Sequence, residues 1–127
     1  MLTNEERISD ISDKIVTDRM YHNNKPTAVA MTEDLMLIGN TMGELWMYSI
    51  DTYEHLYTFT EKGKEFLNNH ITVIAVHPVK SDYILLGFKG GQIVLLDVAD
   101  YTKSLKIIKD HHKGVPIANL AFCDWIK

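Results

Sequence analysis

The fold of this chain can be read from Ile71 to Ile108, where the sequence is ITVIAVHPVKSDYILLGFKGGQIVLLDVADYTKSLKII. Four short apolar runs lie in this stretch, and the segments between them are rich in Pro, Gly, Ser and Asp, which favour turns. Short apolar runs that alternate with turns in this way predict consecutive antiparallel strands. The stretch therefore predicts a four-stranded meander of the kind that forms one blade of a β-propeller.

The same pattern occurs a second time in the residues before this stretch. Ala30, Ala75 and Ala121 recur in similar apolar contexts at spacings of 45 and 46 residues. A longer match places Leu35–Gly43 over Tyr83–Gly91 at an offset of 48 residues. A repeat of about 46 residues is typical of four-stranded propeller blades, so two blades are predicted.

The repeat divides the chain into five segments. We predict an all-β fold, a partial WD-repeat-like β-propeller with two complete four-stranded blades and flanking strands. The segments are an N-terminal helix or disordered lead (1–12), the last strand of a preceding blade with its connector (13–26), blade one (27–70), blade two (71–115) and the first strand of a following blade (116–127). Because blades bury their faces only against other blades, we expect a piece of a longer protein, self-assembly, or cover from another chain.

The beginning of the chain allows two interpretations. Lys14–Asp18 resembles Lys106–Asp110 at an offset of 92 residues, which is two repeats and favours a strand. Thr3 and Glu6 match a capping box, and the apolar residues that follow have helical spacing, which favours a helix over Asn4–Met20. Both interpretations stay open.

The composition excludes several classes of function. The 127 residues are 46% hydrophobic and carry a formal net charge of −4. Without a basic block, an acidic chain is not expected to bind nucleic acid. No apolar run reaches the length of about 18 residues that a transmembrane helix needs, and the N-terminus lacks the order of a secretory signal. The expected location is therefore cytoplasmic. With Cys123 as the single cysteine, neither an intrachain disulfide framework nor a CxxC zinc site is expected.

Residues that could carry chemistry do not form a recognisable site in the sequence. His111 and His112 are adjacent, so their side chains point apart, and no further ligand has suitable spacing. The glycine-rich run at Gly87–Gly91 lacks the GxxxxGK[ST] pattern of a phosphate-binding loop. The serines lack a GxSxG context and the carboxylates are scattered. We therefore expect no catalytic, cofactor-binding or metal-binding residues, no cofactor and no enzymatic activity.

Binding residues are instead expected on one rim of the propeller, where the hairpins between second and third strands meet the connectors between blades. The glycines assigned to the hairpin turns are Gly39, Gly43, Gly87, Gly90 and Gly91. The candidate partner-binding residues are Lys62, Lys64, Lys89, Lys109, His111, His112 and Lys113. A positive rim on an acidic chain suits an acidic partner or an anionic head group, and the alternative is that these lysines only keep the loops soluble.

The run from Leu85 to Phe122 also resembles a known family. Its glycine hairpin GFKGGQI, the apolar strand that ends in Asp97, the Lys/Asp/His connector and the following Pro-led strand are similar to the WD-repeat propeller region of the vacuolar protein sorting-associated protein 8 family, subunits of the CORVET endosomal tethering complex. The resemblance implies a platform that binds a small GTPase of the Rab type and other tethering-complex subunits. It implies a place on the endosomal membrane surface that is reached only through such partners.

The sequence departs from a full WD repeat, and other functions remain open. The third strands end in Tyr48-Ser49 and Leu96-Asp97 where a full repeat has Trp-Asp, so the internal hydrogen-bond network of such repeats is not expected. One alternative is a WD-like scaffold in a cytoskeletal, ciliary or ubiquitin-ligase complex. The other is a small self-assembling β protein with an unknown ligand.

Overall fold

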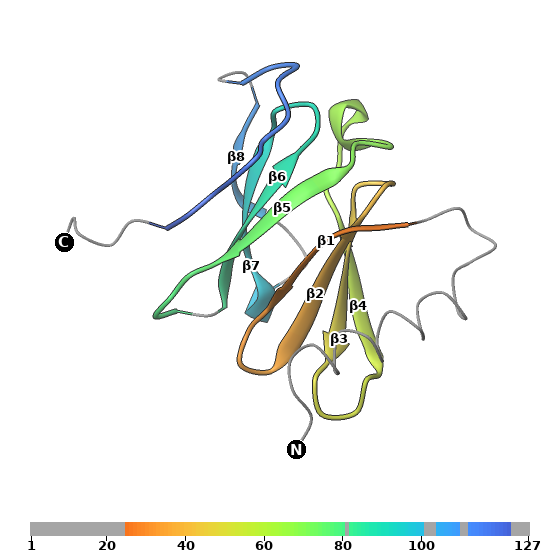
Figure 1. Ribbon diagram of the computed structural model, residues 1–127, viewed down its shortest axis with the longest axis vertical. Coiled ribbons are helices and arrows are strands. Elements are labelled where there is room, and N and C mark those ends of the chain that lie inside the picture. The colour runs from red at the N-terminus through yellow and green to blue at the C-terminus, as the bar shows by residue number, and fades with distance from the viewer. Residues whose placement is uncertain (1–24, 81, 101–103, 110–111, 123–127) are drawn as a thin grey trace.

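The chain folds into two four-stranded antiparallel sheets packed face against face (Figure 1). The computed structural model describes residues 25–80, 82–100, 104–109 and 112–122, so the expectations for residues 1–24 lie outside the described part. The strands are β1 (Pro26–Met31), β2 (Leu35–Asn40), β3 (Glu44–Ser49), β4 (His55–Thr60), β5 (Ile71–Val76), β6 (Tyr83–Phe88), β7 (Ile93–Asp97) and β8 (Ser104–Ile108). In each sheet the strands are neighbours in chain order, which confirms the two predicted meanders.

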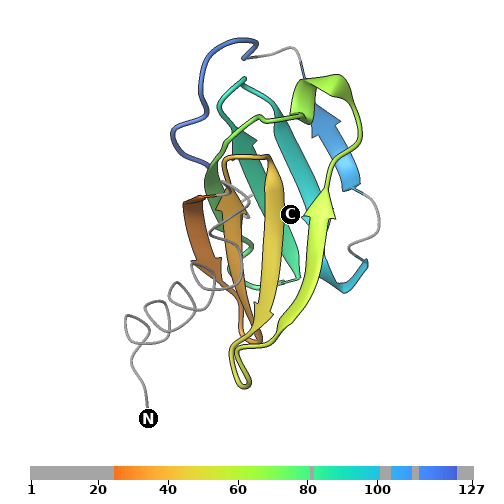
Figure 2. The same cartoon turned by 90° about the vertical axis from the view of Figure 1, so that its right-hand side faces the viewer.

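Two short 3₁₀ helices complete the described elements. One, η2 (Lys64–Phe66), lies in the connector from β4 to β5, and the other, η3 (Val98–Asp100), follows β7. Figure 2 shows the first sheet in front of the second, with the loops of both sheets gathered at the same two ends. Among the described residues, no helix is long and apolar enough to cross a membrane.

The central strands of the first sheet, β2 and β3, are buried on both faces because their side chains alternate between two apolar clusters. The larger cluster lies between the sheets and includes Leu37, Phe59 and Phe66 from the first repeat. The smaller cluster lies on the other face of the first sheet and includes Trp46 and Tyr48, both fully buried. The aromatic residues of the first repeat thus divide between the two faces of one blade.

A β-bulge in the first strand of each sheet directs a threonine toward the segment that follows that sheet in the chain. The ladder of β1 with β2 shifts register at Thr27, and the ladder of β5 with β6 shifts at Thr72. A bulge re-aims the side chain of the extra residue. The Thr27 hydroxyl donates to the carbonyl oxygen of Ile71 at 2.6 Å, and the Thr72 hydroxyl donates to that of Ile117 at 2.5 Å. The repeat in the sequence is therefore also a repeat of contacts, from blade one to Ile71 and from the second sheet to Ile117.

Replacing Thr27 by valine is expected to lower the free energy of unfolding by about 1 kcal/mol, because the bulge keeps its shape but loses the bond to the Ile71 carbonyl. Urea denaturation measures the change. Thr60→Val on the exposed side of β4 is the matched control and should shift stability by less than about 0.5 kcal/mol. Equal losses in the two variants would show that the bond between blades does not stabilise the fold.

Gly39 and Gly87 lie inside β2 and β6, which corrects their assignment to the hairpin turns. The reason is a close approach of the next segment along the chain. A Cβ atom on Gly39 would lie 2.5 Å from Cγ2 of Ile71, and one on Gly87 would lie 2.6 Å from Cγ2 of Ile117. Both distances are far shorter than an ordinary contact, so only glycine fits at these two positions.

The described C-terminal residues follow the second sheet without forming a strand of their own. Residues 112–122 contain no assigned strand, and the expectation that 116–127 begins a following blade stays a prediction. The backbone N–H of Ile117 donates to the carbonyl oxygen of Phe88 at 3.2 Å. The ring of Phe122 lies 4.8 Å from the ring of His77. The segment thus packs along β5 and β6.

Candidate functional site

Four loops meet at one end of the two sheets and form a continuous surface, seen at the top of Figure 1. We call this surface the connector rim. It consists of the β2–β3 turn (41–43), the β4–β5 connector (61–70), the β6–β7 turn (89–91) and the segment 112–115 that follows β8. The turns at the other end of the sheets, which include 32–34, 51–54 and 77–80, form the opposite rim.

Each hairpin turn of the connector rim packs under the connector that leaves the same blade. Gly43 has φ 81° and a Cβ there would lie 2.6 Å from the carbonyl oxygen of Phe66. Gly91 has φ 93° and a Cβ there would overlap the carbonyl oxygen of His112. Glycine is required because the turn needs a left-handed backbone and because the connector backbone comes so near. These two glycines lie in the turns, as predicted.

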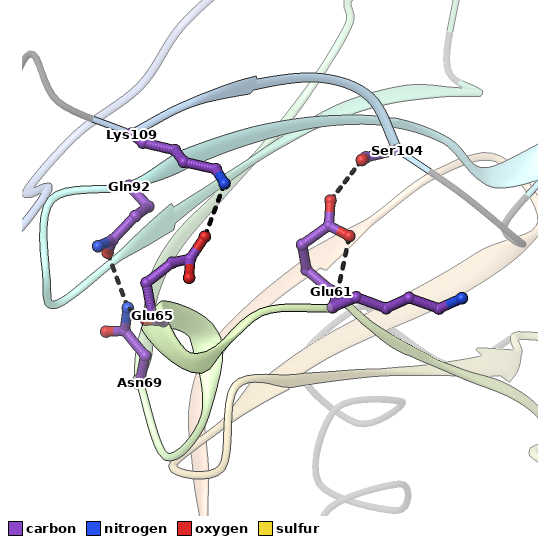
Figure 3. A network of polar contacts seen from close by, with 7 residues as sticks. Glu61, Glu65, Asn69, Gln92, Ser104 and Lys109 are labelled. Carbon is purple, nitrogen blue, oxygen red and sulfur yellow. Dashed lines mark hydrogen bonds and ion pairs between the residues drawn. The ribbon is translucent and has the colours of Figure 1, made fainter.

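A polar network joins the connector of blade one to the turn of blade two (Figure 3). The Asn69 amide group donates to Oε1 of Gln92 at 2.7 Å and to the carbonyl oxygen of Glu65 at 2.8 Å. The backbone N–H of Gly90 donates to Oδ1 of Asn69 at 2.9 Å. Asn69 therefore uses both its donors and its acceptor, which fixes its side chain and the distance between the loops.

Two carboxylates of the connector bind to β8 and the residue that follows it. Oε1 of Glu65 lies 2.8 Å from Nζ of Lys109, and the Ser104 hydroxyl donates to Glu61 (Figure 3). The hydrogen bond from Lys109 is the main cause that lowers the pKa of Glu65 below its ordinary value, and a backbone hydrogen bond at Glu65 adds to it. These contacts attach the β4–β5 connector to the second sheet at its beginning, through Glu61, and at its middle, through Glu65.

Replacing Glu65 by glutamine is expected to destabilise the chain at neutral pH and to have little effect in acid. Because the pKa of Glu65 is lowered in the folded state, its ion pair stabilises the fold above the ordinary glutamate pKa, and this stabilisation is lost as the pH falls through the lowered pKa. Urea midpoints of the wild type and the variant, measured above and below this window, test it. Glu33→Gln on the opposite rim controls for loss of an exposed carboxylate. A difference that stays constant with pH would contradict the assignment.

The structure brings most of the predicted rim lysines to one surface. Lys62, Lys64, Lys89 and Lys113 are exposed on the connector rim. Lys109 also lies there but is engaged by Glu65. His112 is likewise exposed on the rim, whereas His111 lies outside the described residues. No group of three or more metal-ligating side chains occurs in the described part of the chain.

The residues that hold these loops in place were not predicted from the sequence. Asn69 and Gln92 are separated by 23 residues, so their pairing depends on how the blades pack. The signal in the sequence was Gln92, a polar residue at the start of an apolar run. In the structure, Gln92 is only 8% exposed. A buried amide needs a hydrogen-bond partner, and Asn69 of the other blade provides it.

Charge is divided between the two ends of the sheets. Among the described residues, the lysines on or beside the connector rim are Lys25, Lys62, Lys64, Lys89, Lys109 and Lys113, and the carboxylates there are Glu44, Glu61 and Glu65. The described carboxylates at the other end are Glu33, Asp34, Asp51, Glu54, Asp82, Asp97 and Asp100, with Lys80 as the lysine among them. The connector rim is therefore locally positive on a chain whose formal net charge is −4.

Two consecutive four-stranded meanders, packed face to face and joined by repeated contacts, define a segment of a WD40-type β-propeller. Solved structures with this arrangement include a mitotic checkpoint complex (TM-score 0.65, 14% identity, 78% of this chain and 28% of that chain). Similar structures also include the RRP9 WD40 repeats, with a TM-score of 0.61 and 13% identity over 72% of this chain and 28% of that chain. Another is the Cps50 (Swd1) β-propeller domain of Myceliophteria thermophila, with a TM-score of 0.60 and 18% identity over 76% of this chain and 30% of that chain. The chain spans less than a third of each of these chains.

The sequence places the chain more narrowly within this class. A model of the Vps8 β-propeller family matches residues 3–126, and the chain belongs to this family. Among curated proteins, no sequence matches it significantly. The predicted partial propeller and the family resemblance seen at Leu85–Phe122 are both confirmed.

Proposed function

We propose that the chain is a non-enzymatic protein-interaction platform, part of an endosomal tethering subunit that binds a small GTPase of the Rab type and other tethering subunits. The observation that carries this proposal is membership of the Vps8 β-propeller family over residues 3–126. The location that follows is the cytoplasmic surface of the endosome, reached through these partners. The blade boundaries at 27–70 and 71–115, with a following blade that begins at 116, belong to the same proposal.

The connector rim supports this proposal because its loops are fixed in advance of binding. The Asn69 network, the Glu65–Lys109 ion pair and the Ser104–Glu61 hydrogen bond tie the β4–β5 connector to both blades. A surface whose loops are already ordered loses less conformational entropy when a partner binds. The rim can therefore present exposed side chains to a protein without rearranging.

A following blade is supported by the repeated contacts at Ile117. Its side chain lies against Gly87, and its carbonyl accepts from Thr72, as Ile71 does with Gly39 and Thr27. Ile117 therefore contacts blade two in the way that Ile71, the first residue of β5, contacts blade one.

A pull-down tests the tethering assignment. The 127-residue chain is immobilised and incubated with endosomal Rab GTPases, each loaded with GTP analogue or with GDP, and separately with the core tethering subunits. Retention of a GTP-loaded Rab or of a tethering subunit is expected. If none is retained while the chain remains folded by circular dichroism, the tethering function is wrong, although the fold is unaffected.

A further inference from the structure

The described carboxylates of the connector rim are already engaged, whereas four of its lysines have no carboxylate partner in the described part of the chain. Glu65 pairs with Lys109, and Glu61 accepts from the Ser104 hydroxyl and from the backbone N–H of Lys62. Glu44 accepts from the Asn40 side chain at 3.1 Å. By contrast, no carboxylate of the described residues forms an ion pair with the ammonium groups of Lys62, Lys64, Lys89 and Lys113. The positive charge of the rim is therefore available to a partner.

Large apolar side chains are exposed among these lysines. Leu67 is 70% exposed, Val115 is 61% exposed and Met42 is 37% exposed. Each belongs to a different loop of the rim, so the three are spread across both blades. Leu67 precedes Asn68, whose φ of 55° is unusual for a residue other than glycine, and the buried Phe66 on its other side anchors the loop. The chain thus holds Leu67 outward on a loop whose neighbouring residue is fixed in the core.

Resting on the proposed function, we propose that the connector rim binds a partner segment that is acidic and carries apolar side chains. Its carboxylates would pair with the lysines, and its apolar side chains would cover Leu67 and Val115. The acidic opposite rim would repel the same segment, so the charge division also sets the face to which it binds. Apolar contacts supply the affinity of such a site, and the lysines supply its selectivity and rate of association.

A protein segment fits this surface better than an anionic membrane does. A flat bilayer would bring its head groups against Glu61 and Glu65 as well as against the lysines, since both carboxylates lie on the same connector as Lys62 and Lys64. A peptide can place its carboxylates beside the lysines alone. The exposed apolar side chains also lie on three separate loops, which suits a segment that crosses the rim.

The test selects binders without assuming their sequence. A phage library of random 12-residue peptides is panned against the 127-residue chain, and the most enriched peptide is synthesised with a fluorophore for anisotropy. We expect enriched peptides with net negative charge and at least two apolar side chains, and a Kd that rises with salt. The triple variant K62E/K89E/K113E should weaken binding about tenfold or more, and Leu67→Ser about fivefold.

Matched variants on the opposite rim serve as controls. Val79 is 75% exposed there, so Val79→Ser removes an equally exposed apolar group, and Glu33→Lys changes charge at the same end. Both should change Kd by less than about twofold. Circular dichroism confirms that every variant is folded. Enrichment of neutral or basic peptides, no enrichment, or unchanged binding by the triple variant would each overturn the proposal.

Two further outcomes separate this inference from the tethering function. If vesicles of phosphatidylcholine with phosphatidylserine retain the chain through the same lysines, and no peptide does, the rim recognises a membrane and the inference is wrong. If a Rab or tethering subunit is retained equally by the wild type and the triple variant, the tethering function stands and the inference fails. If acidic peptides bind through the rim but no tethering protein is retained, the rim chemistry stands and the tethering assignment fails.

Discussion

Replacing Phe66 by alanine is expected to lower the free energy of unfolding by about 3–5 kcal/mol. Phe66 belongs to the connector between the blades, yet its side chain is only 1% exposed and lies in the core between the two sheets. Its ring packs edge to face against Phe88, with centroids 5.1 Å apart and an interplanar angle of 68°. Removing the ring leaves a cavity that rigid strands on both sides cannot fill, so the full cost of a large-to-small change applies.

The next residue provides the control for Phe66. Leu67 is 70% exposed, so Leu67→Ala should change stability by less than about 0.5 kcal/mol although it alters the same loop. Urea denaturation followed by circular dichroism measures both variants. A cycle with Phe88→Ala isolates the ring pair, for which a coupling of about 0.5–1.5 kcal/mol is expected. Similar losses for the two single variants would mean that the connector, and not the buried ring, determines stability.

The neighbours Phe66 and Leu67 connect the core with the connector rim, because the first is buried and the second is exposed. Phe66 fixes the 3₁₀ helix η2 from below, and the exposed Leu67 takes its position from that anchor. The Phe66→Ala variant should therefore bind the selected acidic peptide more weakly than wild type under conditions in which it remains folded. Stability and binding are coupled here because one short connector serves both the core and the surface.

The strands could be predicted from the sequence because each depends on local information. An apolar run between turn residues defines a strand, and the repeat aligns one blade with the other, as Leu35–Gly43 aligns with Tyr83–Gly91. Neighbouring strands are also neighbours in the chain, so the order of each sheet follows from its short turns. The fold was thus accessible without knowledge of any long-range contact.

Contacts between blades could not be predicted in the same way. Gly39 looked like a turn residue because glycine usually breaks a strand, but the structure uses it to admit Ile71 of the next blade. The bulges at Thr27 and Thr72 are shifts of one residue in the register between neighbouring strands. The pattern of apolar residues does not determine where such a shift occurs. For these features the sequence repeat marks the positions, whereas only the packing shows their roles.

The candidate site was predictable in location and not in detail. Placing turns and connectors on one rim required only the strand order, so Lys62 and Lys89 were found. The sequence could not show that Lys109 is paired with Glu65, because the two residues meet only when β8 packs beside the connector. It also could not show that Leu67 is exposed beside a buried Phe66, since both are apolar residues of one loop.

Gly91→Ala is expected to lower the free energy of unfolding by about 3–4 kcal/mol, through two separate costs. The first is the left-handed backbone at φ 93°, which costs a residue with a Cβ about 1–2 kcal/mol. The second is steric, because the new methyl group would overlap the His112 carbonyl oxygen and would lie 3.0 Å from that of Val115. Backbone atoms cannot rotate away as a side chain can, so the segment 112–115 has to move.

Gly114→Ala separates these two costs. Gly114 also has a left-handed backbone, at φ 78°, but a Cβ there would have no neighbour within 4 Å. It should therefore lose only about 1–2 kcal/mol, the conformational part alone. Urea denaturation of both variants gives the difference, which measures how firmly the β6–β7 turn presses on the connector. Displacement of that connector should also shift Lys113 and weaken peptide binding in Gly91→Ala more than in Gly114→Ala, and equal losses in the two variants would show that the connector is free to move.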